Sequence, residues 1–523
     1  MKKIICLALL LVMLFSLTSC VVSEKYDYDM TKYITIPTIN GHVIDVELDY
    51  VQATIDNYLL SSAKSSATKY AVQEGETVRI ILTFTQLKYI DEAQTVDQRG
   101  DVILTTDPQA ILNNKDKEST KVDSESVKTD SRVITSDGKT YIEITLGGKT
   151  GTVDSDGDGV MDKVYDLNAD IEKKFLKKKL GQEHNDIYTM PDAASLASLP
   201  EAFAPLKEYA GQKVYMTYQV ISKPVAEGDV INAKYTGYYI DDDGNIALDD
   251  KGKEKTFDSG TSAFFIGSHL AIDDFEKGFI GANIDEEVSF YATFPDDYQS
   301  ADLKGKKVMF KGTVKTIYDV PEYDLDFVKA TFGDFESLEA FETSLKETYA
   351  AEKILEYLVT KSVVLDYPRA EYKIIERQLE DIEIDFATQY SMSLDTYITQ
   401  NLGMADRDAY IKYSMLTEMA YYAYAQQNNL VPTEKDIATA RDVLIATYKA
   451  QYLEDGGSNI TEDQALAYAT SFVDEGLEAR DLHQEALYAM VADHIETQYV
   501  MNEKPTTYTS VTRGGSYFDD KAE

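Results

Sequence analysis

Apolar and polar residues alternate in short runs through the middle of the chain, and Gly and Asp turns separate the runs. The pattern extends over residues 224–320 and closes with a strand-like segment at residues 308–317. A two-residue period is typical of β-strands, so we predict a small sheet with one short segment around Phe275 outside it. The aromatic residues of this stretch outnumber what so small a sheet needs for its core.

After residue 320 the apolar period becomes helical. Leu338, Phe341 and Leu345 recur at intervals of three and four residues, which is the spacing of the buried face of a helix. We therefore predict an all-α domain of several long helices at residues 321–502, followed by a polar tail at residues 503–523.

Local signals mark where some of these helices begin and end. Thr433 precedes Asp436 by three residues, and Thr461 precedes Gln464 by the same interval. A hydroxyl followed by an acidic or amide residue at this spacing is typical of a helix N-terminus. Gly456 is a stop signal.

The first seventy residues divide into two segments. Residues 1–20 carry two Lys, then an apolar run at residues 4–15, then small residues, which is the pattern of a secretory signal. The run is too short to span a membrane as a helix. Residues 21–69 are predicted to form a polar tether, a strand around residues 42–48 and a helix around residues 53–63.

The end of the signal, Leu17-Thr18-Ser19-Cys20, resembles a bacterial lipobox. The resemblance implies that Cys20 becomes the diacylated first residue of the mature protein, which would anchor it at the outer face of the cell membrane. The alternative is an ordinary signal peptide with an incidental cysteine. Because Cys6 is the other cysteine, the mature chain is expected to have no disulfide.

Composition limits the partners. The 523 residues are enough for about three domains. Acidic residues outnumber basic ones 91 to 51, for a net charge of −40, so little positive charge is left to neutralise phosphates and we expect no nucleic-acid partner. The five His are scattered without metal-ligand spacing, and no phosphate loop or Gly-x-Ser-x-Gly motif occurs.

Several motifs follow one another in residues 224–320. In order they are Glu227-Gly228-Asp229, Ala233–Tyr238, Lys255–Gly260, Phe264–Gly267, Ile272–Gly278, Phe294–Tyr298 and Asp302–Lys306. This order resembles an FKBP-type prolyl isomerase domain, and its ending is most similar to the version inside trigger factor, the bacterial chaperone. The resemblance implies an α+β fold in which an FKBP-like half-barrel sheet with a helix precedes an all-α chaperone-type domain.

Prolyl isomerisation calls for an apolar pocket and no cofactor, because an apolar wall desolvates the amide and favours its twisted form. The resemblance implies that Phe275 forms the pocket floor, that Ile272 offers its backbone N–H to the substrate carbonyl, that Asp258 orients polar groups at the rim, and that Tyr298 covers one side. The set it assigns to the pocket is Tyr235, Phe257, Asp258, Phe264, Ile272, Phe275, Tyr298 and Phe310. The alternative for each is the core of a small sheet.

Two features depart from the family pattern. Asp273-Asp274 stands where Pro-Gly is expected before Phe275, which places negative charge beside the pocket. The loop at residues 240–255 is long and acidic. Either feature could lower activity or favour basic substrates. The Gly-Phe-Arg loop of the ribosome-binding domain is missing, so a ribosome partner is not expected.

Residues 70–223 carry echoes of the same motifs around a long polar middle. Residues 71–82 repeat the register of residues 225–235, and two later segments echo residues 290–296 and 303–310. We predict a degenerate first FKBP-like copy, with Leu82 in place of Tyr235 and Met216 in place of Phe310. An unrelated β domain is the alternative.

An acidic segment at residues 154–166 interrupts this first copy. Its carboxylates at alternate positions could converge on a structural Ca²⁺, as in calcium loops of the EF-hand or thrombospondin-repeat type. The predicted ligands are Asp154, Asp156, Asp158 and Asp162. Tyr165 stands where an EF-hand has Glu, and an acidic hairpin turn is the alternative.

Together these features predict a lipid-anchored prolyl isomerase and chaperone that acts on unfolded exported polypeptides with X-Pro bonds. The chain has 38 Tyr, and those at residues 410–424 are either a client-binding face or ordinary helix core. Two other hypotheses stay open: an inactive holdase or scaffold lipoprotein, and a calcium-dependent surface protein that rests on the acidic loop alone.

Overall fold

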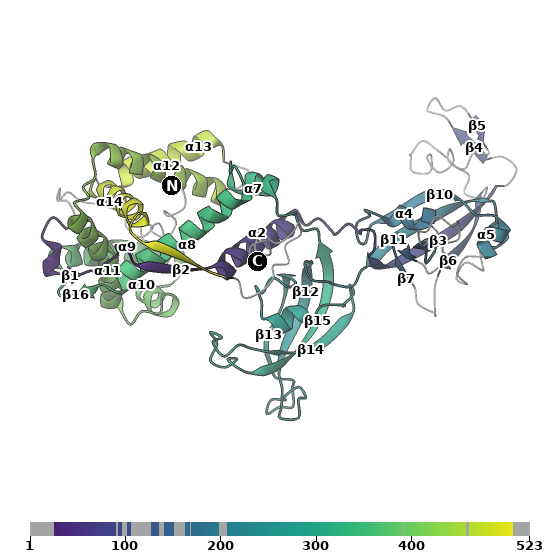
Figure 1. Ribbon diagram of the computed structural model, residues 1–523, viewed down its shortest axis with the longest axis horizontal. Coiled ribbons are helices and arrows are strands. Elements are labelled where there is room, and N and C mark those ends of the chain that lie inside the picture. The colour runs from purple at the N-terminus through teal and green to yellow at the C-terminus, as the bar shows by residue number, and fades with distance from the viewer. Residues whose placement is uncertain are drawn as a thin grey trace. The chain divides into compact units, whose positions relative to one another are not determined.

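The computed structural model divides the chain into two compact units (Figure 1). Of the described residues, one unit joins 26–51 to 335–505, and the other is Gln52–Asp334. The structure describes residues 26–89, 93–96, 102–105, 127–134, 141–150, 163–167, 169–197, 207–390, 392–456, 460–477 and 479–505.

Residues 224–320 form the predicted small sheet. Its antiparallel strands are β12 (Val230–Tyr239), β13 (Thr256–Phe265), β14 (Glu287–Thr293) and β15 (Lys307–Tyr318), in the order β13-β12-β15-β14. The short helix α6 (Asp273–Lys277) lies between β13 and β14 in the chain and places Phe275 in the sheet's core. The predicted segment outside the sheet is this helix.

Another antiparallel sheet forms within residues 70–223. Because it comes earlier in the chain, we call it the first sheet and the sheet of residues 224–320 the second sheet. Its strands are β3 (Thr77–Tyr89), β6 (Val127–Ile134), β7 (Ile142–Thr145), β10 (Glu183–Thr189) and β11 (Lys213–Ser222). They lie in the order β10-β11-β3-β6, and β7 also pairs with β3. The helix α4 (Ala169–Phe175) stands between β7 and β10 in the chain, and the helix α5 (Ala193–Ala197) follows β10.

Two-stranded ribbons complete this region. One joins β4 (Ala93–Val96) to β5 (Val102–Thr105), and the other joins β8 (Lys149–Thr150) to β9 (Lys163–Val164).

The two sheets have the same strand order and the same register. Met216 pairs with Phe84 on β3, as Phe310 pairs with Gly237 on β12. On the other side of the same strands, Asp186 pairs with Met216, as Phe290 pairs with Phe310. The sheet and the helix that the degenerate-copy hypothesis requires are both present, and the pairing aligns Leu82 with Tyr235 and Met216 with Phe310 as predicted.

The turns that enter the two sheets also correspond. The Gln73 N–H donates to Glu76 at 2.6 Å, and the Ala226 N–H donates to Asp229 at 2.8 Å. The next Gly of each turn then donates to the end of the neighbouring strand, at 2.8 Å from Gly75 and 2.9 Å from Gly228. A local acidic side chain therefore fixes the entry of β3 and of β12 in the same way.

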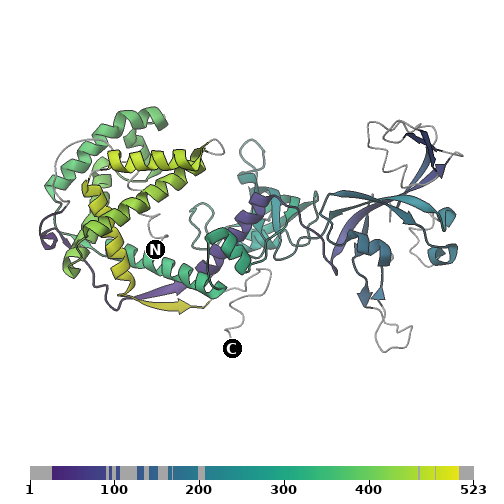
Figure 2. The same cartoon turned by 90° about the horizontal axis from the view of Figure 1, so that it is seen from above.

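The other unit contains the predicted long helices. They are α8 (Leu338–Thr360), α9 (Arg369–Tyr390), α11 (Arg407–Asn428), α12 (Glu434–Gly456), α13 (Glu462–Gly476) and α14 (Ala479–Glu496). Figure 2 shows α12 and α13 side by side, and they pack through Leu444, Tyr448, Ala469 and Val473. Shorter elements of this helical unit are α10 (Leu394–Thr396) and the π-helical turn η3 (Tyr397–Asn401). The helix α7 (Leu325–Phe332) belongs to the unit that contains the two sheets.

The predicted helix-start signals are confirmed. Thr461 and Gln464 form a reciprocal capping box at the start of α13. Thr433 and Asp436 exchange hydrogen bonds of 2.8 and 3.3 Å just before α12. Gly456 is the last residue of α12. These signals are readable from the sequence because each acts within one turn of helix.

The two ends of the chain differ from the predicted tether and polar tail. Tyr26 and Met30 are 1% and 0% exposed within the helical core. The expected strand forms as β2 (Val43–Glu47), and it pairs in parallel with β17 (Val500–Lys504). The helix α2 (Leu48–Ser66) begins earlier than predicted. The β2–β17 pairing could not be predicted, because the periodicity of a segment does not indicate a strand partner more than 450 residues away in the chain.

The remaining N-terminal elements are short. The 3-10 turn η1 (Met30–Lys32) leads to β1 (Ile34–Thr35), which pairs with β16 (Val363–Val364). Among the described residues, no helix combines the length and the apolar character that crossing a membrane requires.

Candidate functional site

Aromatic rings from the second sheet and α6 form one contiguous cluster around Phe275. The Phe275 ring centroid lies 4.8 Å from Phe310, 4.9 Å from Phe264 and 5.5 Å from Tyr235, each in edge-to-face contact. Phe257 joins the cluster through Phe310 at 5.6 Å. The structure therefore brings together five of the predicted site residues, which come from four elements.

The sheet leaves room for these rings at Gly237. A Cβ atom at this position would lie 2.4 Å from the Phe257 ring, a distance at which the ring has to move. In the first sheet Phe84 occupies the corresponding position on β3 and is fully buried. The Phe257 ring can therefore occupy its position because residue 237 of β12 has no side chain.

A polar pair lies at the edge of the cluster. The Tyr235 hydroxyl donates to Asp258 at 2.9 Å, and Asp258 is exposed. Burial, followed by the hydrogen bond to Asp258, raises the pKa of Tyr235 above its usual range. The hydroxyl therefore stays protonated near neutral pH and remains a donor to Asp258.

Ile272 precedes α6 as its N-cap residue, with φ −65° and ψ 136°. Its side chain packs against the core beside the aromatic cluster. Within the part of the chain that the structure describes, the Ile272 backbone N–H has no hydrogen-bond partner. It is available as the donor that the sequence predicts, three residues before Phe275.

Tyr298 is less closely associated with Phe275. Its ring lies 4.6 Å from Phe294, which in turn lies 5.8 Å from Phe257. At 37% exposed, Tyr298 borders the cluster on the solvent side, as expected for a residue that covers one side of a pocket.

Sequence reasoning missed three rings of the cluster. Phe279, Phe290 and Phe294 contact Phe275 or Phe257 at centroid distances of 5.3, 5.9 and 5.8 Å. A signal was available, because Phe279 follows Phe275 by one helical turn and Phe290 precedes Phe294 by two strand periods.

The Asp273-Asp274 departure has a structural role. Asp273 interacts with His269 and Lys277. Burial acts to raise the pKa of Asp273, but these two partners hold it below its usual range. Asp274 accepts a 3.0 Å hydrogen bond from the Thr293 N–H at the end of β14. Both carboxylates are therefore engaged beside α6.

The acidic loop at residues 240–255 is an ordered extension between β12 and β13. Asp241 accepts hydrogen bonds from two backbone N–H groups of its own turn at 2.8–3.1 Å, and Asp249 does the same at 2.8–2.9 Å. Two isolated bridges, Ile240–Ile246 and Leu248–Glu254, pair the arms of the loop.

Three positions of the first sheet that correspond to aromatic positions of the second carry no aromatic residue. By register, Leu82 replaces Tyr235, Met216 replaces Phe310 and Asp186 replaces Phe290. Leu82 and Met216 are fully buried. These positions support a structural role for the first copy, as the sequence predicts.

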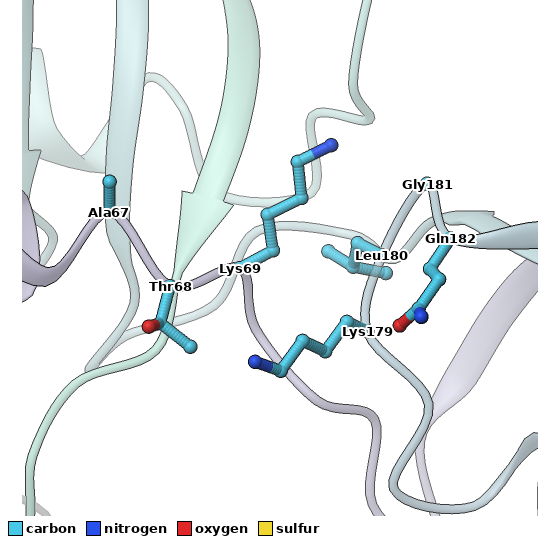
Figure 3. A pocket seen from close by; sticks show the side chains of 7 residues that line it. All are labelled: Ala67, Thr68, Lys69, Lys179, Leu180, Gly181 and Gln182. Atoms are coloured by element: carbon cyan, nitrogen blue, oxygen red, sulfur yellow. The ribbon is translucent and has the colours of Figure 1, made fainter.

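A polar hollow of about 370 Å³ lies elsewhere in this unit, lined by Ala67, Thr68, Lys69, Lys179, Leu180, Gly181 and Gln182. Figure 3 shows the side chains of Lys69 and Lys179 pointing in different directions. The two ammonium groups do not converge, and none of the predicted pocket residues lines this hollow.

The remaining predicted sites lie outside the described residues: the lipidation site Cys20 and the calcium ligands Asp154, Asp156, Asp158 and Asp162. Where the structure does describe the chain, no group of three or more His, Cys, Asp or Glu could hold a metal ion. In the helical unit Tyr410, Tyr422 and Tyr424 are 3–4% exposed, so for them the core interpretation is confirmed.

Comparison with known proteins places the aromatic cluster in a family. Residues 222–320 match the family model described as FKBP-type peptidyl-prolyl cis-trans isomerase. This segment is an FKBP-type domain. It contains all four strands of the second sheet, α6 and every aromatic residue of the cluster.

Curated relatives that match part of the chain include trigger factors. The chain is 37% identical over 136 residues to trigger factor of Pediococcus pentosaceus, which covers 25% of this chain and 28% of that protein. It is 26% identical over 283 residues to trigger factor of Caldicellulosiruptor bescii, and this alignment covers 49% of this chain and 61% of that protein. The alignments with these two and with trigger factor of Agathobacter rectalis span 28–62% of the relatives' own length.

Among solved structures, this chain matches one described as "Promiscuous Substrate Recognition in Folding and Assembly Activities of the Trigger Factor Chaperone". The identity is 16%, the TM-score is 0.17, and the match covers 53% of this chain and 64% of that one. The similarity to trigger factor therefore rests on sequence, and the site rests on the geometry of the FKBP-type domain.

Proposed function

We propose that the FKBP-type domain isomerises X-Pro peptide bonds and that its pocket is formed by the aromatic cluster around Phe275. One observation carries the proposal: the Ile272 N–H has no partner in the described part of the chain and stands at the N-terminus of the helix that carries Phe275. An apolar surface beside a single backbone donor is the combination that prolyl isomerisation requires.

The chemistry needs no proton transfer. The barrier of about 18–20 kcal/mol arises from the partial double bond of the amide, and the twisted amide is less polar than either planar form. Phe275, Phe264 and Tyr235 would replace water around the prolyl ring, and this favours the twisted form. The Ile272 N–H would hold the preceding carbonyl while the bond rotates, so that the pocket fits the twisted state best.

The clients and the location extend this proposal. Unfolded exported polypeptides are the proposed clients, since trigger factor relatives support binding of unfolded chains and the N-terminal 20 residues have the pattern of an export signal. Acylation at Cys20 would hold the protein at the outer face of the cell membrane. Incorporation of labelled fatty acid into the wild type, and its loss in Cys20→Ser, would test the anchor.

The activity is tested by removing the proposed donor while keeping the fold. Ile272 has φ −65°, which proline adopts without strain, so Ile272→Pro removes the N–H at a compatible position. Ile272→Ala is the matched control, because it removes the side chain and keeps the N–H. Cis–trans exchange of a Leu-Pro peptide is measured by NMR with the full chain.

We expect acceleration by the wild type, at most a few-fold loss in Ile272→Ala and a loss of tenfold or more in Ile272→Pro. Wild-type acceleration that persists in Ile272→Pro would remove the donor from the mechanism. A wild type without acceleration would refute the isomerase and leave the holdase as the function.

Specific observations favour client binding by the helical unit as a second, separable function. Leu466 and Tyr468 on α13 are each 45% exposed, and Tyr413 on α11 is 52% exposed. Half-exposed Tyr and Leu side chains offer apolar surface to unfolded chains. Suppression of client aggregation should therefore be unchanged in Ile272→Pro and reduced in a Leu466→Ser, Tyr468→Ser variant.

A further inference from the structure

One buried carboxylate organises the loop that leads into the proposed pocket. Glu276, the residue after Phe275 on α6, is 2% exposed. Its Oε2 accepts hydrogen bonds from the backbone N–H of Gly267 at 2.8 Å and of His269 at 3.2 Å. Its Oε1 accepts one from the Ala271 N–H at 2.8 Å. Three successive odd-numbered residues of one loop thus donate to a single side chain.

This loop needs such support because of its backbone. Gly267 and His269 both have positive φ, 85° and 59°, and the second value is unfavourable for a residue with a side chain. The Ser268 hydroxyl donates to the Phe265 carbonyl at 2.7 Å, which fixes the start of the loop. The rest of the loop depends on the Glu276 carboxylate.

The loop ends at the proposed donor. Ala271, whose N–H is held by Glu276, directly precedes Ile272, and Phe275 directly precedes Glu276 in the chain. One carboxylate therefore connects the residue after Phe275 with the residue before Ile272. Both of its oxygens take part, since Oε2 accepts from Gly267 and Oε1 from Ala271, each at 2.8 Å.

Burial and hydrogen bonding act in opposite directions on the pKa of Glu276. Burial has the larger effect and raises the pKa above its usual range, whereas the hydrogen bonds from the N–H groups of Ala271, His269 and Gly267 and the charge of His269 act to lower it. Asp56 of α2 is a second buried carboxyl that interacts with it.

The first sheet supplies an internal comparison. Glu172 on α4 is fully buried and accepts hydrogen bonds from the Leu167 N–H at 2.9 Å and the Gly147 N–H at 3.1 Å. It precedes its sheet's β10 as Glu276 precedes β14, yet by register the aromatic pocket positions of that copy are lost. Glu172 therefore reports what such a carboxylate contributes to the fold alone.

We propose that Glu276 is a positioning residue of the isomerase: by holding the loop at residues 267–271, it positions the Ile272 N–H at the start of the helix that carries Phe275. This proposal rests on the proposed isomerase function. It assigns Glu276 no contact with the substrate.

The test compares Glu276→Gln with Glu172→Gln in the full chain. A glutamine amide keeps the volume of the side chain, but its NH₂ end cannot accept from backbone N–H groups. We expect Glu276→Gln to lower kcat/KM for the Leu-Pro peptide by tenfold or more, and Glu172→Gln to leave it within twofold. Amide hydrogen exchange of Gly267 and Ala271 should accelerate in Glu276→Gln and stay unchanged in Glu172→Gln.

The outcomes separate the two proposals. A wild type without activity overturns the isomerase and this inference together. An active wild type, with Glu276→Gln equally active despite faster exchange at Gly267, overturns the inference alone and leaves the carboxylate as part of the fold.

If Glu276→Gln does not fold, Glu276→Asp replaces it, because the shorter carboxylate can still accept hydrogen bonds. Activity per folded molecule should then fall in step with the acceleration of Ala271 exchange. Activity that stays at the wild-type value while exchange accelerates would refute the inference.

Discussion

Asp56 on α2 is a buried acid whose charge the fold disfavours. Its side chain is fully buried, and its Oδ1 accepts a 2.9 Å hydrogen bond from the Gln52 amide. Its Oδ2 has no hydrogen-bond partner among the described residues. Burial raises the pKa of Asp56 to about 7; the Gln52 hydrogen bond opposes this, and the charge of Glu276 adds to it.

The magnitude follows from linkage between protonation and folding. Between about pH 4 and pH 7 the folded state keeps a proton that the unfolded state releases, so the free energy of unfolding falls as pH rises through this window. Each pH unit corresponds to about 1.4 kcal/mol. The shift from 3.8 to about 7 therefore amounts to a loss of about 4 kcal/mol by pH 7, which is an upper bound.

Asp56→Asn removes this penalty, because an amide resembles the protonated acid. We expect the variant to match the wild type at pH 4 within about 1 kcal/mol and to exceed it by up to about 4 kcal/mol at pH 8. Urea unfolding at pH 4, 6 and 8, followed by far-UV circular dichroism, measures the difference. Asp250→Asn, at an exposed acid of the same unit, is the control and should change little at any pH.

The comparison across pH decides the matter. An Asp56→Asn variant that is less stable than the wild type at pH 8 would show that Asp56 is ionised and stabilised in the fold. A stability gap of equal size at pH 4 and pH 8 would refute titration as its cause.

Three further predictions follow from single contacts. Gly237→Ala places a Cβ 2.4 Å from the Phe257 ring, which has to move. Because a misplacement of about 1 Å in a site costs one to two orders of magnitude in rate, this variant should lower kcat/KM in the Leu-Pro exchange assay about tenfold. Unchanged activity would exclude Phe257 from the pocket. Asp229→Ala leaves the Lys223 ammonium, 6% exposed, without its 2.6 Å partner, and should cost about 3–5 kcal/mol in urea unfolding; a cost below about 1 kcal/mol would mean that the ammonium finds water. Met30→Ala, at a fully buried position of the helical core, should cost about 2–5 kcal/mol, whereas truncation in a solvated tether would cost nothing.

Much of the FKBP-type domain could be predicted from its sequence because its signals are local. The two-residue period defines the strands, and the turn acid Asp229 acts within a few residues of its own position. In the helical unit, the helix cap Thr461 could be predicted for the same reason. The similarity of residues 71–82 to residues 225–235 also predicted the register of the first sheet. Residues at the same distance from corresponding turns pair with corresponding residues of the neighbouring strand. Five ring-bearing residues of the site came from motif order in the same way.

Other features depend on contacts that no local pattern encodes. The sequence by itself determined that residues 224–320 form a sheet with a surplus of aromatic residues and that helices follow, because period and capping are properties of neighbouring residues. Only the tertiary structure decided that β2 pairs with β17, that Phe279 and Phe290 complete the cluster, and that Glu276 holds the loop before Ile272. Each of these contacts depends on which surfaces meet once the chain has folded. Burial in the folded chain then raises the pKa of Glu276 and of Asp56.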